Sequence, residues 1–228
     1  MRGDDSADLL ALLDDAPLNR RYWGAFALLT ALAVFETYDF LGGGYLIGLL
    51  GARWHLTYGQ AAIILTAEAV GAMIGALVFG VLADARGRKW SVIVGACICA
   101  AGAGLTGLVP NGAWQMVAML RLLVGVGETA GVIPALIILV EWTPTRRRTL
   151  MAAFYCVCVA AGRLLALRVS HAYGSTIGWR GLAAFGVAPA FVGALIWLYV
   201  PESARWLAAK GRIAEARAVA AQLLGVPP

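Results

Sequence analysis

Six long apolar segments limit what this chain can fold into more than any other feature of its sequence. They cover approximately residues 22–51, 58–83, 90–109, 113–142, 150–171 and 181–200. A helix that spans a lipid bilayer needs about 20 mostly apolar residues. Hydrophobic residues make up 61% of the chain and charged residues 14%, against about half and about a quarter in soluble proteins. The sequence therefore predicts an all-α integral membrane protein with six transmembrane helices.

Basic residues are divided unequally between the two predicted sides of the membrane. With the N-terminus inside, the inner segments hold Arg2, Arg20, Arg21, Arg86, Arg88, Lys89, Arg146, Arg147, Arg148, Arg205, Lys210, Arg212 and Arg217. The outer segments hold only Arg53 and Arg180. Because Lys and Arg in short loops stay cytoplasmic, both termini are predicted to be cytoplasmic in a multi-pass protein of a bacterial-type inner membrane. The net charge of +5 follows from this asymmetry, so no nucleic-acid partner is predicted.

The two ends of the chain are predicted to lie outside the membrane. Residues 1–21 form an acidic cytoplasmic segment without the positive start and short apolar core of a secretory signal, and residues 22–200 form the six-helix bundle. Residues 201–228 are predicted to be a cytoplasmic amphipathic tail or the start of a central linker. One helix on the membrane surface is expected there. Its apolar face would consist of Trp206, Leu207, Ile213, Ala216 and Leu223.

Charged residues also occur inside the predicted spans, in a repeating order. The first span holds Glu36 and Asp39, the second Glu68, the fourth Arg121 and Glu128, and the fifth Arg163 and Arg168. The third and sixth hold none, which favours a 3+3 inverted repeat whose first two helices line a polar cavity and whose third faces lipid. Each such charge costs about 3 kcal/mol or more by insertion scales. Structural ion pairs would explain them, but their confinement to four helices favours a substrate or proton path.

Four motifs follow one another along the chain in a fixed order, the last of them in two segments around the sixth span. The segment GVLADARGRK resembles the loop between helices two and three of the major facilitator superfamily, G-x-x-x-D-[RK]-x-G-R-[RK]. Its matching residues are Gly80, Asp84, Gly87, Arg88 and Lys89, while Ala85 departs from the pattern. RLLVGVGE at 121–128 and EWTPTRRR at 141–148 resemble the motifs R-x-x-x-G-x-G and E-x-x-P-x-x-x-R. GWR at 178–180 and PESARWL at 201–207 resemble signatures around helix six in the sugar-porter and aromatic-acid branches.

This resemblance implies one half of a major facilitator fold and transport of a small organic solute, not an enzyme. The segment ETYDF at 36–40 is similar to the acidic D-G-[FY]-D-like element of the aromatic-acid:proton symporters. Glu36 and Asp39 are three residues apart and share a helix face, and burial disfavours the charged form of a carboxyl group. The pair is therefore a candidate proton acceptor, and Arg121 resembles the arginine implicated in proton coupling. Proton-coupled symport of an organic, or aromatic, acid is predicted, with a sugar or other metabolite as the alternative.

Arg163 lies where family members generally carry small residues. Buried arginines bind carboxylates through paired hydrogen bonds, so Arg163 is either part of an anion site or a counter-ion for Glu36, Asp39 or Glu128. The predicted substrate and proton pathway consists of Glu36, Asp39, Glu68, Arg121, Glu128 and Arg163. The loop residues Gly80, Asp84, Gly87, Arg88 and Lys89 form the predicted conformational switch.

Two further patterns concern packing. Gly71, Gly75 and Gly80 form a small-residue stripe that suits close packing on a moving partner. The four cysteines form two C-x-C pairs, Cys97 with Cys99 and Cys156 with Cys158. Side chains two apart on a helix point in different directions, so these cysteines are predicted to be apolar fillers. No catalytic residue, metal ligand or cofactor is predicted.

The number of spans bears on how the protein would work. Family members carry about twelve helices in two pseudo-symmetric halves, and six are predicted here. The expectation is a half or truncated transporter, completed by a second copy in a homodimer or by a complementary six-helix half. Its other expected partners are the lipid bilayer, protons and a small organic acid or sugar. A membrane subunit or fragment without transport activity is the other reading.

Overall fold

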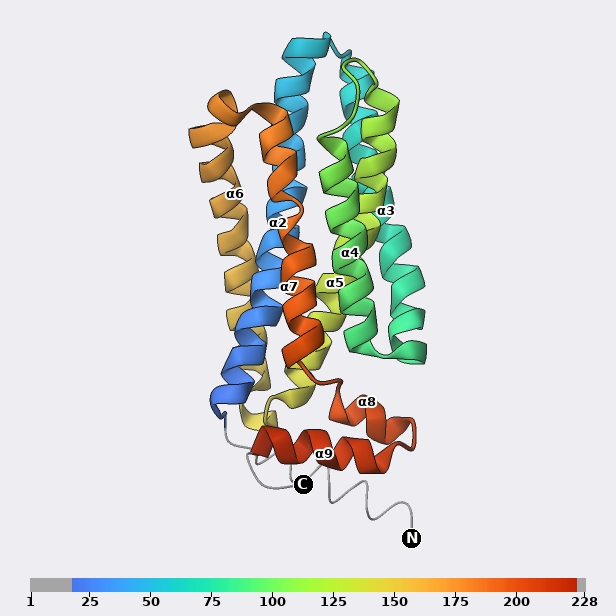
Figure 1. Cartoon of the computed structure of the whole chain (residues 1–228), viewed down its shortest axis with the longest axis vertical. Helices are drawn as coiled ribbons and strands as arrows, with labels where there is room; N and C mark the ends of the chain where they lie inside the picture. The colour runs from blue at the N-terminus through green and yellow to red at the C-terminus, as the bar shows by residue number, and fades with distance from the viewer. Residues whose placement is uncertain (1–17, 225–228) are drawn as a thin grey trace.

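The computed structural model describes residues 18–224 as a bundle of long helices with two short helices across one end (Figure 1). The long helices are α2 (Arg20–Trp54), α3 (Tyr58–Arg86), α4 (Arg88–Thr106), α5 (Trp114–Trp142), α6 (Arg148–Phe185) and α7 (Ala188–Tyr199). A 3-10 turn, η1 (Thr145–Arg147), precedes α6, and α8 (Ala204–Ala209) and α9 (Ile213–Leu224) follow α7. The predicted all-α membrane fold with six apolar helices is confirmed.

Local sequence explains where several of these helices begin and end. Thr57 and Gln60 form a reciprocal capping box at the start of α3. The side chain of Asn19 accepts a hydrogen bond from the backbone N–H of Tyr22 at the start of α2. Gly178 has φ 65° and ψ 179° inside α6, a conformation that glycine adopts readily. The last two apolar spans cover Thr145–Gly174 and Thr176–Tyr199, and Gly178 lies near the start of the sixth.

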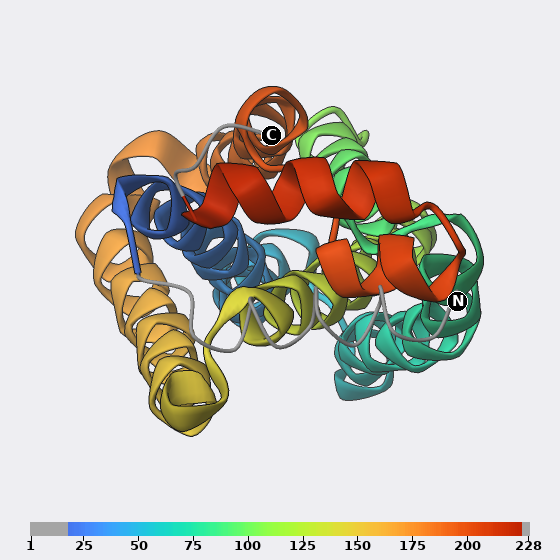
Figure 2. The same cartoon turned by 90° about the horizontal axis from the view of Figure 1, so that it is seen from below.

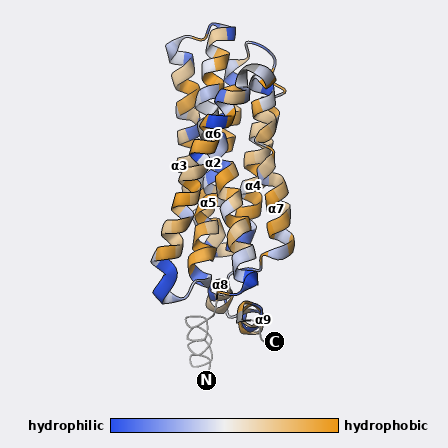
Figure 3. Ribbon diagram, turned by 90° about the vertical axis from the view of Figure 1, so that its left-hand side faces the viewer, coloured by the Kyte–Doolittle hydropathy of each residue, from blue (hydrophilic) through white to orange (hydrophobic). Residues whose placement is uncertain are grey.

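Hydropathy follows the length of the bundle. Figure 3 shows hydrophobic residues along the long helices and hydrophilic residues gathered at the end near α8. Large apolar side chains are exposed on the outer faces, among them Leu77 and Val81 of α3, Leu164 of α6 and Phe191 of α7. An exposed apolar surface of this extent suits a lipid environment or a further packed surface.

Helix α5 packs extensively against both α3 and α4, α2 packs against α6, and α4 packs against α7. The prediction that the third helix of each triplet faces lipid is wrong for α4, because much of α4 is buried inside the bundle. Small residues explain this position. A Cβ on Gly95 would lie 2.5 Å from the backbone nitrogen of Gly131 and 2.8 Å from the carbonyl oxygen of Gly127, so the α4 and α5 backbones touch there.

The glycine stripe of α3 also packs inside this bundle. A Cβ on Gly71 would overlap the backbone of Leu122, and one on Gly75 would lie 2.5 Å from the carbonyl oxygen of Val126. Both neighbours belong to α5, so the close packing predicted for Gly71 and Gly75 is found within the bundle. Gly80 has no atom within 4 Å of the position its Cβ would take. The close approach therefore ends before the loop motif.

The segment after Pro201 forms two helices instead of the predicted single one. The chain turns at Gly211, which has φ 75°, and α8 and α9 lie across the end of the bundle (Figure 2). Trp206, Leu207, Ala216 and Leu223 are buried in a core shared with the lower ends of the long helices, while Ile213 is half-buried. The expected placement of this apolar face on the membrane surface is therefore wrong, because the face packs on the bundle itself.

Candidate functional site

Four of the charged residues predicted within the spans are buried near the middle of the bundle. Glu36 and Asp39 belong to α2, Glu68 to α3 and Arg121 to α5, and their exposed fractions are 0%, 4%, 2% and 1%. Glu128 of α5 is half-buried and interacts electrostatically with Glu36, Asp39 and Glu68. These five residues are named the buried charge cluster here. The structure thus brings together residues that are up to 92 positions apart between Glu36 and Glu128.

Arg121 holds the centre of the buried charge cluster. Its Nη1 donates a hydrogen bond to Oδ2 of Asp39 at 3.2 Å, and it lies 3.8 Å from Oε1 of Glu68. The Nε and Nη2 groups of Arg121 have no hydrogen-bond partner among residues 18–224. An arginine has five N–H donors in a planar fork, so most of its donors are not used by these two carboxylates. The free donors could bind a further acceptor, such as the carboxylate of a solute.

Glu36 is the buried acid with the fewest partners. Neither oxygen of its carboxyl group has a hydrogen-bond partner in the described part of the chain. An isolated ionised carboxylate at such a position costs far more free energy than a protonated one, because it loses its hydration without compensation. The carboxyl group of Glu36 is therefore buried without a compensating hydrogen bond from the residues between 18 and 224.

Two glycines that sequence reasoning did not single out make room for these side chains. A Cβ on Gly131 of α5 would overlap the carboxyl group of Glu36. A Cβ on Gly43 of α2 would lie 2.9 Å from Oε2 of Glu68 and 3.3 Å from Nη1 of Arg121. The helical spacing could have pointed to Gly43, because this residue lies one turn after Asp39 on the same face of α2.

The free space at the buried charge cluster is small. A cavity of about 10 Å³ lies beside Asp39 and Arg121 and is lined also by Tyr38, Gly43, Leu46, Leu182 and Ala183. A volume of about 10–15 Å³ is the least that holds one water molecule. The cavity beside Asp39 and Arg121 therefore has room for about one water molecule.

Arg163 lies apart from the centre of the cluster. It is exposed on α6, and its charge interacts with that of Glu128. Arg168, five residues further along α6, is also exposed. Of the six predicted pathway residues, five therefore meet inside the bundle and Arg163 lies at its surface.

A second polar group lies at the end of the bundle that carries α8 and α9. Nη2 of Arg88 lies 3.1 Å from Oε1 of Glu141 and 3.6 Å from Oδ1 of Asp84. Glu141 also accepts a hydrogen bond from the hydroxyl of Ser203. Both carboxylate oxygens of Glu202 accept from the backbone N–H of Lys89 at 3.1 Å. Three of the quoted motifs thus converge on one network.

The turn that places this network requires glycine. Gly87 has φ 117°, which residues with a Cβ rarely adopt, and a Cβ there would overlap the carboxylate of Glu202. The indole N–H of Trp206 donates to the carbonyl oxygen of Asp84 at 2.9 Å and closes the loop from the other side. Sequence reasoning did not single out Glu202 and Ser203, although both lie inside the quoted PESARWL segment.

Comparison with known proteins shows the family of this chain. The sequence pattern described as sugar (and other) transporter matches residues 31–228. The chain belongs to the sugar (and other) transporter family of the major facilitator superfamily. Sugar transporter family members span the membrane several times, in agreement with the six apolar helices seen here.

Curated relatives in the sugar transporter family fall into two groups by name. The 4-hydroxybenzoate transporter PcaK of Pseudomonas putida is 29% identical over 212 residues, which are 91% of this chain and 46% of that protein. The gallate transporter of Pseudomonas putida is 31% identical over 231 residues, 97% of this chain and 49% of that protein. Probable polyol transporter 4 of Arabidopsis thaliana is 28% identical over 200 residues, which are 83% of this chain and 38% of that protein. The chain spans less than half the length of these three relatives.

A solved structure shows the same fold. The xylose transporter XylE from E. coli, in a partially occluded inward open conformation, superposes with a TM-score of 0.78 at 18% sequence identity. The match covers 90% of this chain and 54% of XylE. The predicted similarity to a six-helix half of a major facilitator transporter is therefore confirmed.

Proposed function

We propose that these six helices form one wall of a proton-coupled transport path for a small organic acid. The observation that carries this proposal is the buried carboxyl group of Glu36, which lacks a hydrogen-bond partner among residues 18–224 and lies in the same cluster as the Arg121–Asp39 ion pair. A carboxyl group that is dry and unpaired in one conformation takes up a proton. It releases that proton when a conformational change admits water or a cation.

The balance of charge in the cluster supports a coupled mechanism. The cluster holds four carboxyl groups and one buried guanidinium, that of Arg121, and the charge of the exposed Arg163 acts on Glu128. Burial of several uncompensated negative charges is costly, so protons on part of the cluster are required in the closed state. Protonation of Asp39 would weaken its bond to Arg121 and leave the guanidinium available for the carboxylate of a substrate.

The relatives favour an acid as the substrate. Two of them are named as transporters of 4-hydroxybenzoate and of gallate, and both solutes are aromatic carboxylates. The unused Nε and Nη2 donors of Arg121 match the two oxygens of a carboxylate. A sugar or polyol is the second candidate, because the family description and the polyol relative name such solutes.

The network around Arg88 is proposed as the conformational switch, on the side of the membrane proposed to be cytoplasmic. Its ion pairs and hydrogen bonds join the loop between α3 and α4, the end of α5 and the start of the tail. Opening of a path at this end would have to break them. Arg20, Arg21 and Arg146–Arg148 lie at the same end of the long helices, which supports a cytoplasmic position.

The test of the proposed function is uptake by proteoliposomes that carry an assembled transporter containing these six helices. An imposed pH gradient, alkaline inside, should drive accumulation of labelled 4-hydroxybenzoate but not of labelled myo-inositol. Gradient-driven accumulation of myo-inositol alone would favour the polyol alternative. Absence of any effect of the gradient would contradict proton coupling.

Neutral replacements of the two acids on α2 should uncouple this transport. In the variants Glu36→Gln and Asp39→Asn, gradient-driven accumulation is expected to fall to background, because neither amide takes up a proton. Exchange of labelled for unlabelled substrate at equal pH should persist in Glu36→Gln, which a general loss of folding would not allow. Glu215→Gln, an exposed change in α9, serves as the control. Undiminished uphill uptake in both variants would contradict a proton role for the pair.

Arg163 is expected to favour anionic solutes through its charge. The variant Arg163→Gln should bind 4-hydroxybenzoate about tenfold more weakly, the effect of losing one charge-assisted hydrogen bond, and should bind the neutral 4-hydroxybenzamide as before. Calorimetry on the assembled transporter measures both. Arg168→Gln removes the same charge from the same helix and should leave both affinities unchanged. Equal losses for the acid and the amide would show that Arg163 is only a counter-ion.

A further inference from the structure

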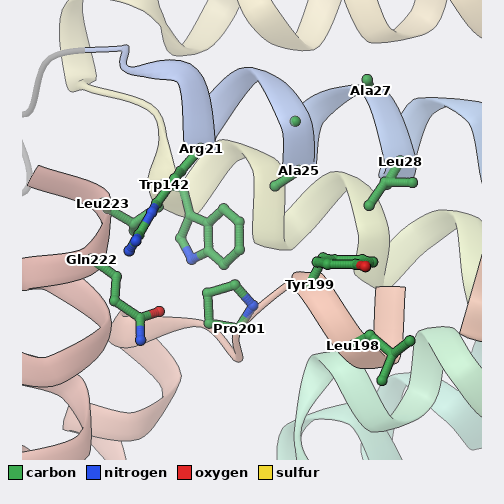
Figure 4. Close-up of a pocket in the computed structure, with 11 residues that line it drawn as sticks. Arg21, Ala25, Ala27, Leu28, Trp142, Leu198, Tyr199, Pro201, Gln222 and Leu223 are labelled. Atoms are coloured by element: carbon green, nitrogen blue, oxygen red, sulfur yellow. The ribbon is translucent and has the colours of Figure 1, made fainter. Parts of the chain in front are cut away.

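A pocket of about 620 Å³ lies at the end of the bundle that carries the tail, away from the buried charge cluster. It is formed by the first turns of α2, the last residues of α5 and α7, and the last turn of α9. Figure 4 shows Arg21, Trp142 and Gln222 on one side of it and Leu28, Leu198 and Tyr199 on the other. The pocket is therefore divided into a polar part and an apolar part.

The polar part holds two donor groups, those of Arg21 and Trp142, that have no acceptor among residues 18–224. Arg21 makes no hydrogen bond or ion pair with any residue between 18 and 224. Trp142 is 3% exposed, and its indole N–H has no partner in that range. The ring nitrogen lies on the side where Arg21 and Gln222 are seen (Figure 4). A buried donor without an acceptor costs about 1–3 kcal/mol, so a ligand with acceptor oxygens and negative charge complements this part of the pocket.

The apolar part extends along the side of the helices. Arg21 is the second residue of α2, whereas Trp142 and Tyr199 are the last residues of α5 and α7. The ends of three spans meet here, at the level where a bilayer changes from hydrocarbon to headgroups. Tyr199 is 70% exposed and opens the pocket toward the side of the bundle. An occupant is therefore expected to hold an anionic group near Arg21 and an acyl chain beside Leu28 and Tyr199.

We propose that this pocket binds an anionic phospholipid from the leaflet on the side of α8 and α9. The headgroup phosphate accepts hydrogen bonds from Arg21 and, after rotation of Gln222, from the indole of Trp142. One acyl chain lies along the space beside Gly24 and Leu28. The bound lipid would contact α2, α7 and α9 together.

The chain supplies matched variants that separate the headgroup from the acyl chain. Arg21→Gln removes the charge in the pocket, and Arg20→Gln removes the same charge from the neighbouring exposed residue, which does not line the pocket. Gly24→Leu fills the apolar part, because a Cβ on Gly24 has no atom within 4 Å. Gly48→Leu is its control, since Gly48 is equally open and exposed on α2 but lies far along the helix.

Binding is measured on the purified full chain in detergent by native mass spectrometry, with phosphatidylglycerol and with phosphatidylcholine of the same acyl chains. The full chain should retain phosphatidylglycerol more strongly. Arg21→Gln should weaken that binding about fivefold, the effect of one basic residue at an anionic surface, and Gly24→Leu should reduce it to the level of phosphatidylcholine. The two control variants should bind as the unmodified chain does, and all four should keep its melting temperature.

Three results would overturn the proposal. Equal binding of both lipids would exclude an anionic site, and equal losses in Arg20→Gln and Arg21→Gln would place the effect on the surface charge in general. Unchanged binding in Gly24→Leu would show that no acyl chain enters the pocket. If the full chain binds no phosphatidylglycerol and a crosslinker on Gly24→Cys captures the acidic residues before position 18, that segment is the occupant instead.

Discussion

Replacing Arg121 by methionine is expected to lower the free energy of unfolding of the bundle by about 3–5 kcal/mol, the effect of breaking a buried ion pair by removing one partner. The methionine fills a similar volume, but Asp39 and Glu68 would remain buried without the guanidinium that lies 3.2 Å and 3.8 Å from them. Chemical denaturation in detergent, followed by circular dichroism, measures the change. Wild-type stability in Arg121→Met would contradict the role of Arg121 as the shared counter-ion.

A compensated variant separates stability from transport. Combining Arg121→Met with Asp39→Asn and Glu68→Gln removes the two orphaned charges and should recover most of the lost stability, since neutral replacement of a whole buried ion group is often tolerated. Proton-driven uptake by an assembled transporter should stay absent in this variant. Recovery of both properties would show that the cluster serves only to hold the helices together, which is the structural reading that the sequence leaves open.

Adding a single methyl group at Gly71 is expected to destabilise the bundle by about 3 kcal/mol, at the upper end of the usual cost of overpacking. The new Cβ would overlap the backbone of Leu122. Backbone atoms cannot rotate away as a side chain can, so α3 and α5 must separate. Thermal unfolding of Gly71→Ala in detergent should show a clear decrease in melting temperature.

Gly80→Ala is the control for this prediction, because it makes the same change on the same helix. No atom lies within 4 Å of a Cβ on Gly80, and alanine favours a helix over glycine by about 1 kcal/mol. Gly80→Ala should therefore be as stable as the unmodified chain or slightly more stable. Equal destabilisation by both variants would mean that the glycines act through the loop motif and not through the contact of α3 with α5.

The helices were predictable because a bilayer selects for length and apolar composition, which a sequence displays directly. The membership of Glu36, Asp39, Glu68 and Arg121 in one site was also predictable, since a charge within a span must be buried beside a partner. Their contacts were not, because these depend on how closely α2, α3 and α5 approach one another. Gly43 and Gly131 leave room for the charged side chains there; the spacing from Asp39 pointed to Gly43, whereas nothing in the local sequence pointed to Gly131.

The surface on which the tail packs was also not predictable from its sequence. Its apolar residues were recognised, but the same amphipathic pattern suits a lipid surface and the end of a protein bundle. The choice depends on buried contacts such as that of Trp206 with Asp84, 122 positions apart. The break at Gly211 was missed because a lone glycine is compatible with a continuous helix at a modest cost.

The contacts of the tail also have a mechanical consequence. The side chain of Asn19 donates to the carbonyl oxygen of Leu223, Glu202 accepts from Lys89, and Ser203 donates to Glu141. Residues at the ends of α2, α4 and α5 are thus crosslinked through a single short segment. Sliding of one helix past another at this end would shear several polar contacts at once. We therefore expect the ends of α2, α4 and α5 to move together while these contacts hold, and to separate only when the tail releases them.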